Sequence, residues 1–133
     1  MAAVPLQQLD GGPLRVLLVE DETFVRLDVA DAFRQAGFEV IEAAAVDAAM
    51  EFIEAGGQVD VMFTDVQTPG LMNGLALAER VRAKFPLMPV IITSGRTNVE
   101  DEDAASRLGK FLPKRYQSAW VANLISEMVG SLP

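Results

Sequence analysis

The sequence predicts an α/β domain built on a parallel β-sheet, and two observations carry this prediction. Four apolar runs are each short enough to be a buried strand, at residues 16–19, 59–63, 90–92 and 111–112. The segments between these runs have the apolar spacing of helices, and strands that alternate with helices form parallel sheets. Polar side chains that follow the strands should therefore meet at the carboxyl edge of the sheet, where open sheets of this kind bind ligands.

The first half of the chain supplies a tail and three regular elements besides the apolar runs. Residues 1–13 contain two prolines and an Asp-Gly-Gly-Pro turn, so we expect a loose tail there. A helix, a strand and a second helix are expected at residues 23–36, 38–41 and 46–55. Gly37 is a suitable stop for the first helix. The expected buried face of that helix comprises Val25, Val29, Ala32 and Ala36.

Three further helices complete the alternation, at residues 75–85, 98–108 and 117–129. Pro86 closes the first of them. The middle one has a poor apolar face, but its acidic run at residues 100–103 suits a helix N-terminus. The expected apolar stripes are Leu77, Val81 and Phe85 in the first helix, and Trp120, Leu124 and Met128 in the last, with Val121 and Ile125 beside them.

Composition predicts one domain, because 133 residues with an apolar fraction of 50% suit a single core. The absence of cysteine excludes disulfides, thiolate metal sites and a cysteine nucleophile. A net charge of -8 argues against direct binding of nucleic acid or of an anionic membrane. No segment has the pattern of a signal peptide or a membrane span, so we expect a cytoplasmic protein. Met1 and the residues before Leu14 favour a complete chain.

Carboxylates gather at the ends of the first and third strands. Glu20 and Asp21 are adjacent, and Asp65 follows another strand. The mutual repulsion of three such groups is relieved by a divalent cation. Oxygen ligands without histidine or cysteine suit Mg²⁺ or Mn²⁺ better than zinc, so these residues are candidate ligands for one of those ions.

Asp65 is the candidate nucleophile of this cluster. A carboxylate beside a divalent cation can attack phosphorus and form an aspartyl phosphate. Asp65 leads into a turn that exposes its side chain, whereas Glu20 and Asp21 form a pair suited to a metal. Thr93 and Lys114 would supply a hydroxyl donor and a positive charge to the new phosphoryl oxygens.

Each of these residues also has a structural interpretation when taken alone. Asp21 or Thr23 could cap the first helix, Asp65 could be an exposed turn residue, and Lys114 could be a solvated charge. Independent coincidence at four strand ends is improbable, so the joint pattern favours a phosphoryl-transfer site.

The same residues resemble the receiver domains of two-component response regulators. The matching segments span residues 14 to about 129, nearly the whole chain. They are Val-Leu-Leu-Val-Glu-Asp-Glu at 16–22, Phe-Thr-Asp at 63–65 with Pro69, Gly70 and Gly74, Pro-Val-Ile-Ile-Thr-Ser-Gly at 89–95, and Phe-Leu-Pro-Lys at 111–114. Their order and separations are similar to those of the family.

The resemblance implies a flavodoxin-like (βα)5 doubly wound sheet of strand order 2-1-3-4-5, with the receiver domain at residues 14–133. Asp65 would accept a phosphoryl group from a histidine kinase or a histidine phosphotransfer protein. Asp21 and Asp65 would bind Mg²⁺ directly, Glu20 would bind it through water, and the Gln67 backbone carbonyl would complete the protein ligands.

The resemblance also implies how the signal leaves the domain. Thr93 and Lys114 would contact the phosphoryl group, and the movement of Thr93 would be coupled to Phe111 on the last strand. The fourth helix, fifth strand and fifth helix would form the signalling surface toward an output protein that the sequence does not identify. Such a protein acts by altered binding to partners and is not an enzyme.

Two departures from the family leave alternatives open. Arg115 stands where the family has proline after the lysine, which implies either a trans bond after Lys114 or a strained loop. The turn at residues 66–70 is also one residue longer than the commonest pattern of the family. A degenerate receiver that binds partners without phosphorylation is therefore the second hypothesis. A hydrolase is the third, but Gln67 occupies the place of the second carboxylate it would need. A kinase is excluded, because the chain has no histidine and no nucleotide-binding glycine loop.

Overall fold

The computed structural model describes residues 12–67, 72–95 and 99–130, with residues 99–101 described by their backbone. Most of the expected tail lies outside these ranges, as do the turn residues 68–70 and Asn98, the expected start of the fourth helix.

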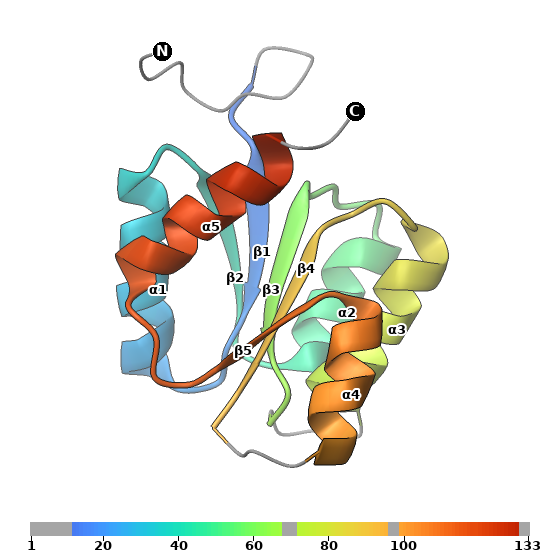
Figure 1. Ribbon diagram of the computed structural model, residues 1–133. Coiled ribbons are helices and arrows are strands. Elements are labelled where there is room, and N and C mark those ends of the chain that lie inside the picture. Colours follow the sequence, from blue (N-terminus) through green and yellow to red (C-terminus); the bar gives the residue numbers. More distant parts are fainter. Residues whose placement is uncertain (1–11, 68–71, 96–98, 131–133) are drawn as a thin grey trace.

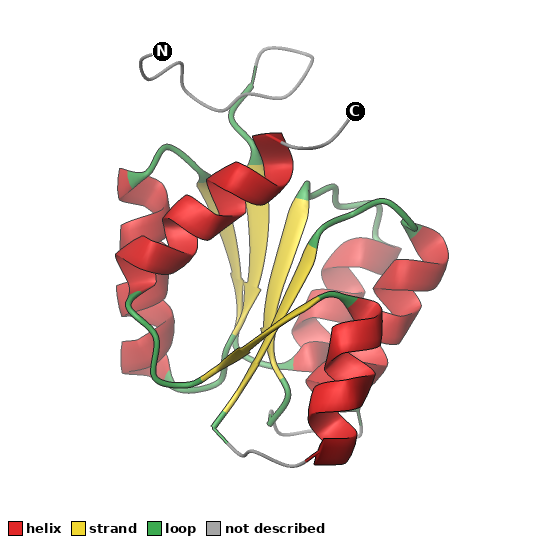
Figure 2. Ribbon diagram, viewed as in Figure 1, coloured by secondary structure: helices red, strands yellow, loops and turns green. Residues whose placement is uncertain are grey.

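Five parallel strands form one sheet in the described chain, in the order β2-β1-β3-β4-β5, which confirms the predicted fold (Figure 1). The strands are β1 (Arg15–Val19), β2 (Glu39–Ala43), β3 (Val61–Asp65), β4 (Val90–Ser94) and β5 (Lys110–Pro113). The helices are α1 (Thr23–Gln35), α2 (Val46–Glu54), α3 (Gly74–Lys84), α4 (Val99–Leu108) and α5 (Ser118–Gly130). Figure 2 shows the strands enclosed between the helices.

The sheet separates two apolar layers. Along β1, Val16 and Leu18 contribute to one layer and Leu17 and Val19 to the other, as the pleat of a strand requires. Helices α1 and α5 cover the first layer, and α2, α3 and α4 cover the second (Figure 1). Because both faces are covered, β3 and β4 are buried along their whole length.

The predicted buried face of α1 is partly wrong. Val29, Ala30 and Phe33 are its buried residues, whereas Ala36 lies beyond the last helical residue and is exposed. The helix ends there because Gly37 turns the chain with a φ of 100°, a conformation that glycine adopts at low cost.

The predicted apolar face of α5 is also shifted. Val121, Ala122 and Ile125 are buried, while Trp120 is 53% exposed. Helix α5 packs against α1 across the first layer, and Leu124 and Met128 are partly buried beside the contact. The buried face is thus centred on Val121, Ala122 and Ile125, and Trp120 lies outside it.

Strand β3 begins two residues later than the apolar run and extends to Asp65. At its start, Asp60 accepts a hydrogen bond from the Arg15 amide at 2.8 Å. At its other end, Asp65 pairs with Thr93 in the register of β3 and β4. The shift places Asp65 inside the sheet ladder, which fixes its backbone.

Arg82 connects the C-terminal ends of α3 and α4. Its guanidinium donates to the Leu108 carbonyl at 2.6 and 3.2 Å, and to the Pro86 carbonyl at 2.6 Å. Leu108 is the last residue of α4, so the cation also meets the negative end of the helix dipole. At the following residue, Gly109, a Cβ atom would collide with the Val90 carbonyl. The end of α4 is thus held against both α3 and the sheet.

Candidate phosphoacceptor site

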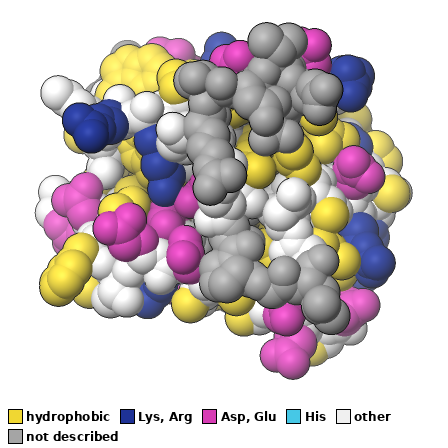
Figure 3. All heavy atoms as spheres, turned by 90° about the horizontal axis from the view of Figure 1, so that it is seen from below, with side chains coloured by type: hydrophobic (Ala, Val, Ile, Leu, Met, Phe, Trp, Pro, Cys, Tyr) yellow, Lys and Arg dark blue, Asp and Glu magenta, His cyan; other side chains and the backbone are white. Residues whose placement is uncertain are grey.

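The carboxyl edge of the sheet brings together the predicted residues from four strands. Glu20 and Asp21 follow β1, Asp65 and Thr93 are paired in β3 and β4, and Lys114 follows β5. Figure 3 views the molecule from this edge, and acidic and basic side chains lie next to one another on it. The convergence follows from the parallel sheet, since all its strands end on the same side.

Three carboxylates form a compact cluster. One oxygen each of Glu20, Asp21 and Asp65 lies within 4.8 Å of the others. Glu20 is 1% exposed and Asp65 is 3% exposed, whereas Asp21 is open to solvent. The expectation that a turn exposes the Asp65 side chain is wrong, because Asp65 is the last residue of the buried strand β3. A cluster with two buried members and one exposed member offers oxygen ligands from the protein and access from outside. This donor set fits a hard divalent cation of the Mg²⁺ type.

Lys114 lies between the two buried carboxylates. Its Nζ donates to Asp65 Oδ2 at 2.8 Å and to Glu20 Oε1 at 3.1 Å. Its backbone N–H donates to the Ser94 carbonyl at 2.8 Å, which holds the start of the loop. The bond between Lys114 and Arg115 is cis in the structure. The side chain thus reaches the cluster although Arg115 replaces the usual proline.

Burial and charge set the protonation of the site. Burial raises the pKa of Glu20, and this effect exceeds the opposing hydrogen bonds from the Glu22 N–H and from Lys114. Burial would lower the pKa of Lys114, but its hydrogen bonds to Asp65 and Glu20 outweigh that effect and raise it. Lys114 is therefore a permanent cation at neutral pH, and Glu20 takes up a proton more easily than an exposed glutamate does.

Thr93 presents a buried hydroxyl group at the end of β4. Its Oγ1 makes no hydrogen bond to any of the residues that the structure describes. Its backbone carbonyl accepts the Val66 N–H at 2.9 Å, which connects it to the residue after Asp65. Most buried hydroxyls are paired, so an orphaned one beside a carboxylate cluster is a donor available to an incoming oxygen.

The turn after Asp65 is held by hydrogen bonds that the sequence did not predict. The Gln67 N–H donates to Asp65 Oδ1 at 3.1 Å, and the Gln67 side chain accepts a hydrogen bond from the Ser94 hydroxyl at 2.9 Å. No spacing signal identifies Ser94, since it lies 27 residues from Gln67. Phe111, the other predicted switch residue, is partly buried against the second apolar layer.

The loop after β1 places the acidic pair. Glu20 Oε2 accepts the Glu22 N–H at 3.0 Å, and Arg26 of α1 donates to the Glu20 carbonyl at 2.9 Å. Arg26 is itself paired with Glu42 at 3.3 Å. The alternative in which Asp21 or Thr23 caps α1 is wrong, because Glu22 is the N-cap residue and makes no side-chain capping bond.

Helix α3 begins directly behind Asp65. Asn73 caps it by accepting the Ala76 N–H at 3.0 Å, and the Gly74 N–H donates to the Val66 carbonyl at 3.1 Å. A Cβ atom at Gly74 would collide with the Asp65 carbonyl. Glycine therefore lets α3 lie directly against the residue that carries the candidate nucleophile.

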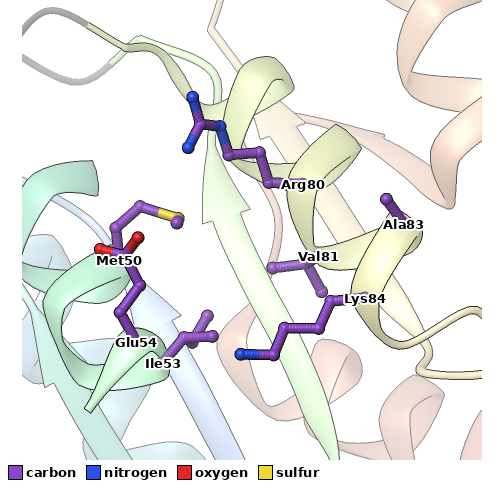
Figure 4. A pocket seen from close by; sticks show the side chains of 7 residues that line it. All are labelled: Met50, Ile53, Glu54, Arg80, Val81, Ala83 and Lys84. Carbon is purple, nitrogen blue, oxygen red and sulfur yellow. The ribbon is translucent and has the colours of Figure 1, made fainter. Parts of the chain in front are cut away.

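Two grooves differ in their relation to this cluster. One of about 360 Å³ adjoins it and lies between α1 and the loop after β5. Its lining residues are Phe24, Val25, Asp28, Val29, Lys114, Arg115, Tyr116 and Ser118. The other, of about 390 Å³, lies between α2 and α3 and contains none of the predicted site residues (Figure 4). The first groove is therefore the one relevant to the cluster.

The chain belongs to the receiver domain family of two-component response regulators, because the family's sequence model matches residues 16–125. The sensor kinase CckA of Brucella abortus is 35% identical over 122 residues, 89% of this chain and 13% of that protein. The probable transcriptional regulatory protein TcrX of Mycobacterium tuberculosis is 31% identical over 105 residues, 78% of this chain and 44% of that protein. The chain thus spans less than half the length of either relative.

Solved structures agree on the fold. The response regulator receiver protein of Sinorhizobium medicae matches with a TM-score of 0.82 and 25% identity, covering 89% of this chain and 95% of that one. TrrA of Thermotoga maritima, solved with Mg²⁺ and BeF, matches with a TM-score of 0.76 and 21% identity, covering 86% and 98%. Among the described residues, no helix combines the length and apolar character that a bilayer crossing needs.

Proposed function

We propose that this protein is a phosphoacceptor receiver that takes a phosphoryl group on Asp65 and signals by altered binding to a partner. The observation that carries the proposal is the arrangement around Asp65. A buried carboxylate is hydrogen-bonded to a lysine, clustered with two further carboxylates, and paired in the sheet with a threonine whose hydroxyl has no hydrogen-bond partner among the described residues. Each group has a use in phosphoryl transfer, and the chain belongs to the receiver family, which supports the proposal.

The transfer would proceed as a displacement at phosphorus. An Asp65 carboxylate oxygen forms the new bond to phosphorus, while the bond from phosphorus to the donor histidine nitrogen breaks and the electron pair stays on that nitrogen. Lys114, already within 2.8 Å of Asp65, would neutralise charge on the phosphoryl oxygens. The Thr93 hydroxyl would donate to one of them.

The residues that would hold Mg²⁺ are Asp21, Asp65 and the Gln67 backbone carbonyl, with Glu20 acting through water. When bound, Mg²⁺ would offset the negative charge of both the acceptor and the incoming phosphoryl group. The carboxylate cluster supports this assignment, as does the solved complex of TrrA, a protein of the same fold, with Mg²⁺ and BeF. Mn²⁺ has the same ligand preference.

The phosphodonor would be a histidine kinase or a histidine phosphotransfer protein, as for other receivers. The groove between α1 and the loop after β5 supports this, because Lys114 lies in its wall and the Phe24 side chain beside it is 83% exposed. After transfer, the Thr93 movement would reach Phe111 and the surface of α4, β5 and α5. The domain would comprise residues 14–133 and would work in the cytoplasm, where receivers meet their kinases.

The test is intact mass spectrometry after incubation with Mg²⁺ and acetyl phosphate. We expect one phosphoryl adduct that is lost in Asp65→Asn and in a sample with excess EDTA. Absence of the adduct in the wild-type protein would contradict the proposal and favour a constitutive interaction module. Continuous release of phosphate from sugar phosphates would instead favour a hydrolase.

A further inference from the structure

Ser94 lies where two loops of the site meet. It is the last residue of β4, is 1% exposed, and follows Thr93. Its hydroxyl donates to Gln67 Oε1 at 2.9 Å, and its carbonyl accepts the Lys114 N–H at 2.8 Å. One buried residue therefore bonds to the turn after β3 through its side chain and to the loop after β5 through its backbone.

Gln67 is held at two of its polar groups. Its N–H donates to Asp65 Oδ1 at 3.1 Å, and its side-chain carbonyl accepts from Ser94. Among the described residues, none donates a hydrogen bond to the Gln67 backbone carbonyl. Within the described chain that oxygen is thus open to a cation, and the two bonds hold Gln67 through the peptide unit before it and through its side chain.

We propose that Ser94 is a positioning residue for the cation of this site. Its hydroxyl would hold Gln67 so that the Gln67 backbone carbonyl faces the cluster of Glu20, Asp21 and Asp65 before the ion arrives. Fixing a ligand in advance removes the cost of ordering it on binding. The inference rests on the proposed function, because it assumes that a divalent cation binds at this cluster.

The bond makes a quantitative prediction for Mg²⁺ affinity. A neutral hydrogen bond contributes a modest net free energy, so its loss should raise the Kd for Mg²⁺ by about 3- to 10-fold. Ser94→Ala removes the donor but keeps the backbone carbonyl that holds Lys114. Gln67→Leu removes the acceptor but keeps the backbone carbonyl that would bind the ion. Because both substitutions delete the same bond, the double variant should be no weaker than either single one.

The experiment is isothermal titration calorimetry of the full chain with MgCl₂, for the wild type, Ser94→Ala, Gln67→Leu and the double variant. Ser126→Ala is the matched control, since the Ser126 hydroxyl donates to the Ala122 carbonyl within α5, away from the cluster. It should leave the Kd unchanged. Phosphorylation of Ser94→Ala by acetyl phosphate should need more Mg²⁺, yet reach the wild-type rate at saturating Mg²⁺.

The outcomes separate this inference from the proposed function. An unchanged Kd in Ser94→Ala, or losses that add in the double variant, would overturn the role of Ser94 while leaving Asp65 as acceptor. A lower phosphorylation rate of Ser94→Ala even at saturating Mg²⁺ would also overturn it, since the defect would then lie outside metal binding. A wild-type chain that does not bind Mg²⁺ would overturn the inference and the proposed site together.

Discussion

Replacing Lys114 with methionine should destabilise the metal-free protein, because it leaves two carboxylates facing each other in the interior. Lys114 Nζ contacts Asp65, whose side chain is 4% exposed, and Glu20, whose side chain is 1% exposed. Breaking a buried pair by removing one partner costs about 3–5 kcal/mol. The Lys114 side chain is itself 23% exposed, and water can screen the remaining charges. We therefore expect the lower end of the range, about 3 kcal/mol at pH 7.5.

Mg²⁺ should recover much of this loss. A cation bound at the cluster would replace the missing positive charge, so it should bind the variant more tightly than the wild type. A ligand stabilises the native state in proportion to the logarithm of its concentration over its Kd. The gain in unfolding free energy from saturating Mg²⁺ should therefore be larger for Lys114→Met than for the wild type. Urea unfolding followed by circular dichroism, in EDTA and in MgCl₂, measures both quantities.

Arg15→Met is the matched control for this experiment. Arg15 and Glu39 form an ion pair of similar length, 3.2 Å, but their side chains are 38% and 40% exposed. Exposed pairs contribute little, so we expect a loss below about 1 kcal/mol and no dependence on Mg²⁺. Equal losses for the two substitutions, or the same gain from Mg²⁺ in Lys114→Met and the wild type, would refute the reasoning.

Two further predictions concern α3 and pH. Gly74→Ala should cost about 1–3 kcal/mol in unfolding free energy and slow phosphorylation, because its Cβ would collide with the Asp65 carbonyl. At Gly130 an added Cβ would meet no described atom within 4 Å beyond its own helix and chain neighbours, so Gly130→Ala should cost nothing measurable. Equal effects of the two substitutions would contradict the prediction. Because burial raises the pKa of Glu20 above 4.5, protonated Glu20 contributes stability that is fully present below pH 4.5 and is lost as pH rises through the raised pKa. In EDTA, the wild type should thus gain stability relative to Glu20→Gln as pH falls from about 7 toward 4.5, and urea midpoints that show no such trend would count against it.

The positions of the main site residues could be predicted because a parallel sheet imposes them. Asp65 and Thr93 end two apolar runs, and adjacent parallel strands place such residues in register. The start of α3 at Gly74 can also be predicted from the sequence, because Asn73 precedes it and asparagine is a frequent N-cap residue.

The remaining features depend on contacts between distant residues. Ser94 ends β4 and Gln67 lies just beyond the end of the neighbouring strand β3, and neither their residue types nor their spacing predicts the hydrogen bond between their side chains. The centre of the α5 face depends on how the helix is rotated against α1. Helical periodicity alone does not distinguish a face centred on Val121 and Ile125 from one that includes Trp120.

Arg82 restricts how α4 can move. Its guanidinium holds the Leu108 carbonyl, and the close contact of Gly109 with Val90 keeps the next residue against the sheet. A helix fastened at one end cannot slide along its axis without breaking these contacts. It can pivot about Leu108 or unwind from its first turn. Any displacement of α4 should therefore decrease along the helix, from a maximum near Val99 to almost none at Leu108. A partner that contacts the first turn of α4 would meet the largest change in the surface.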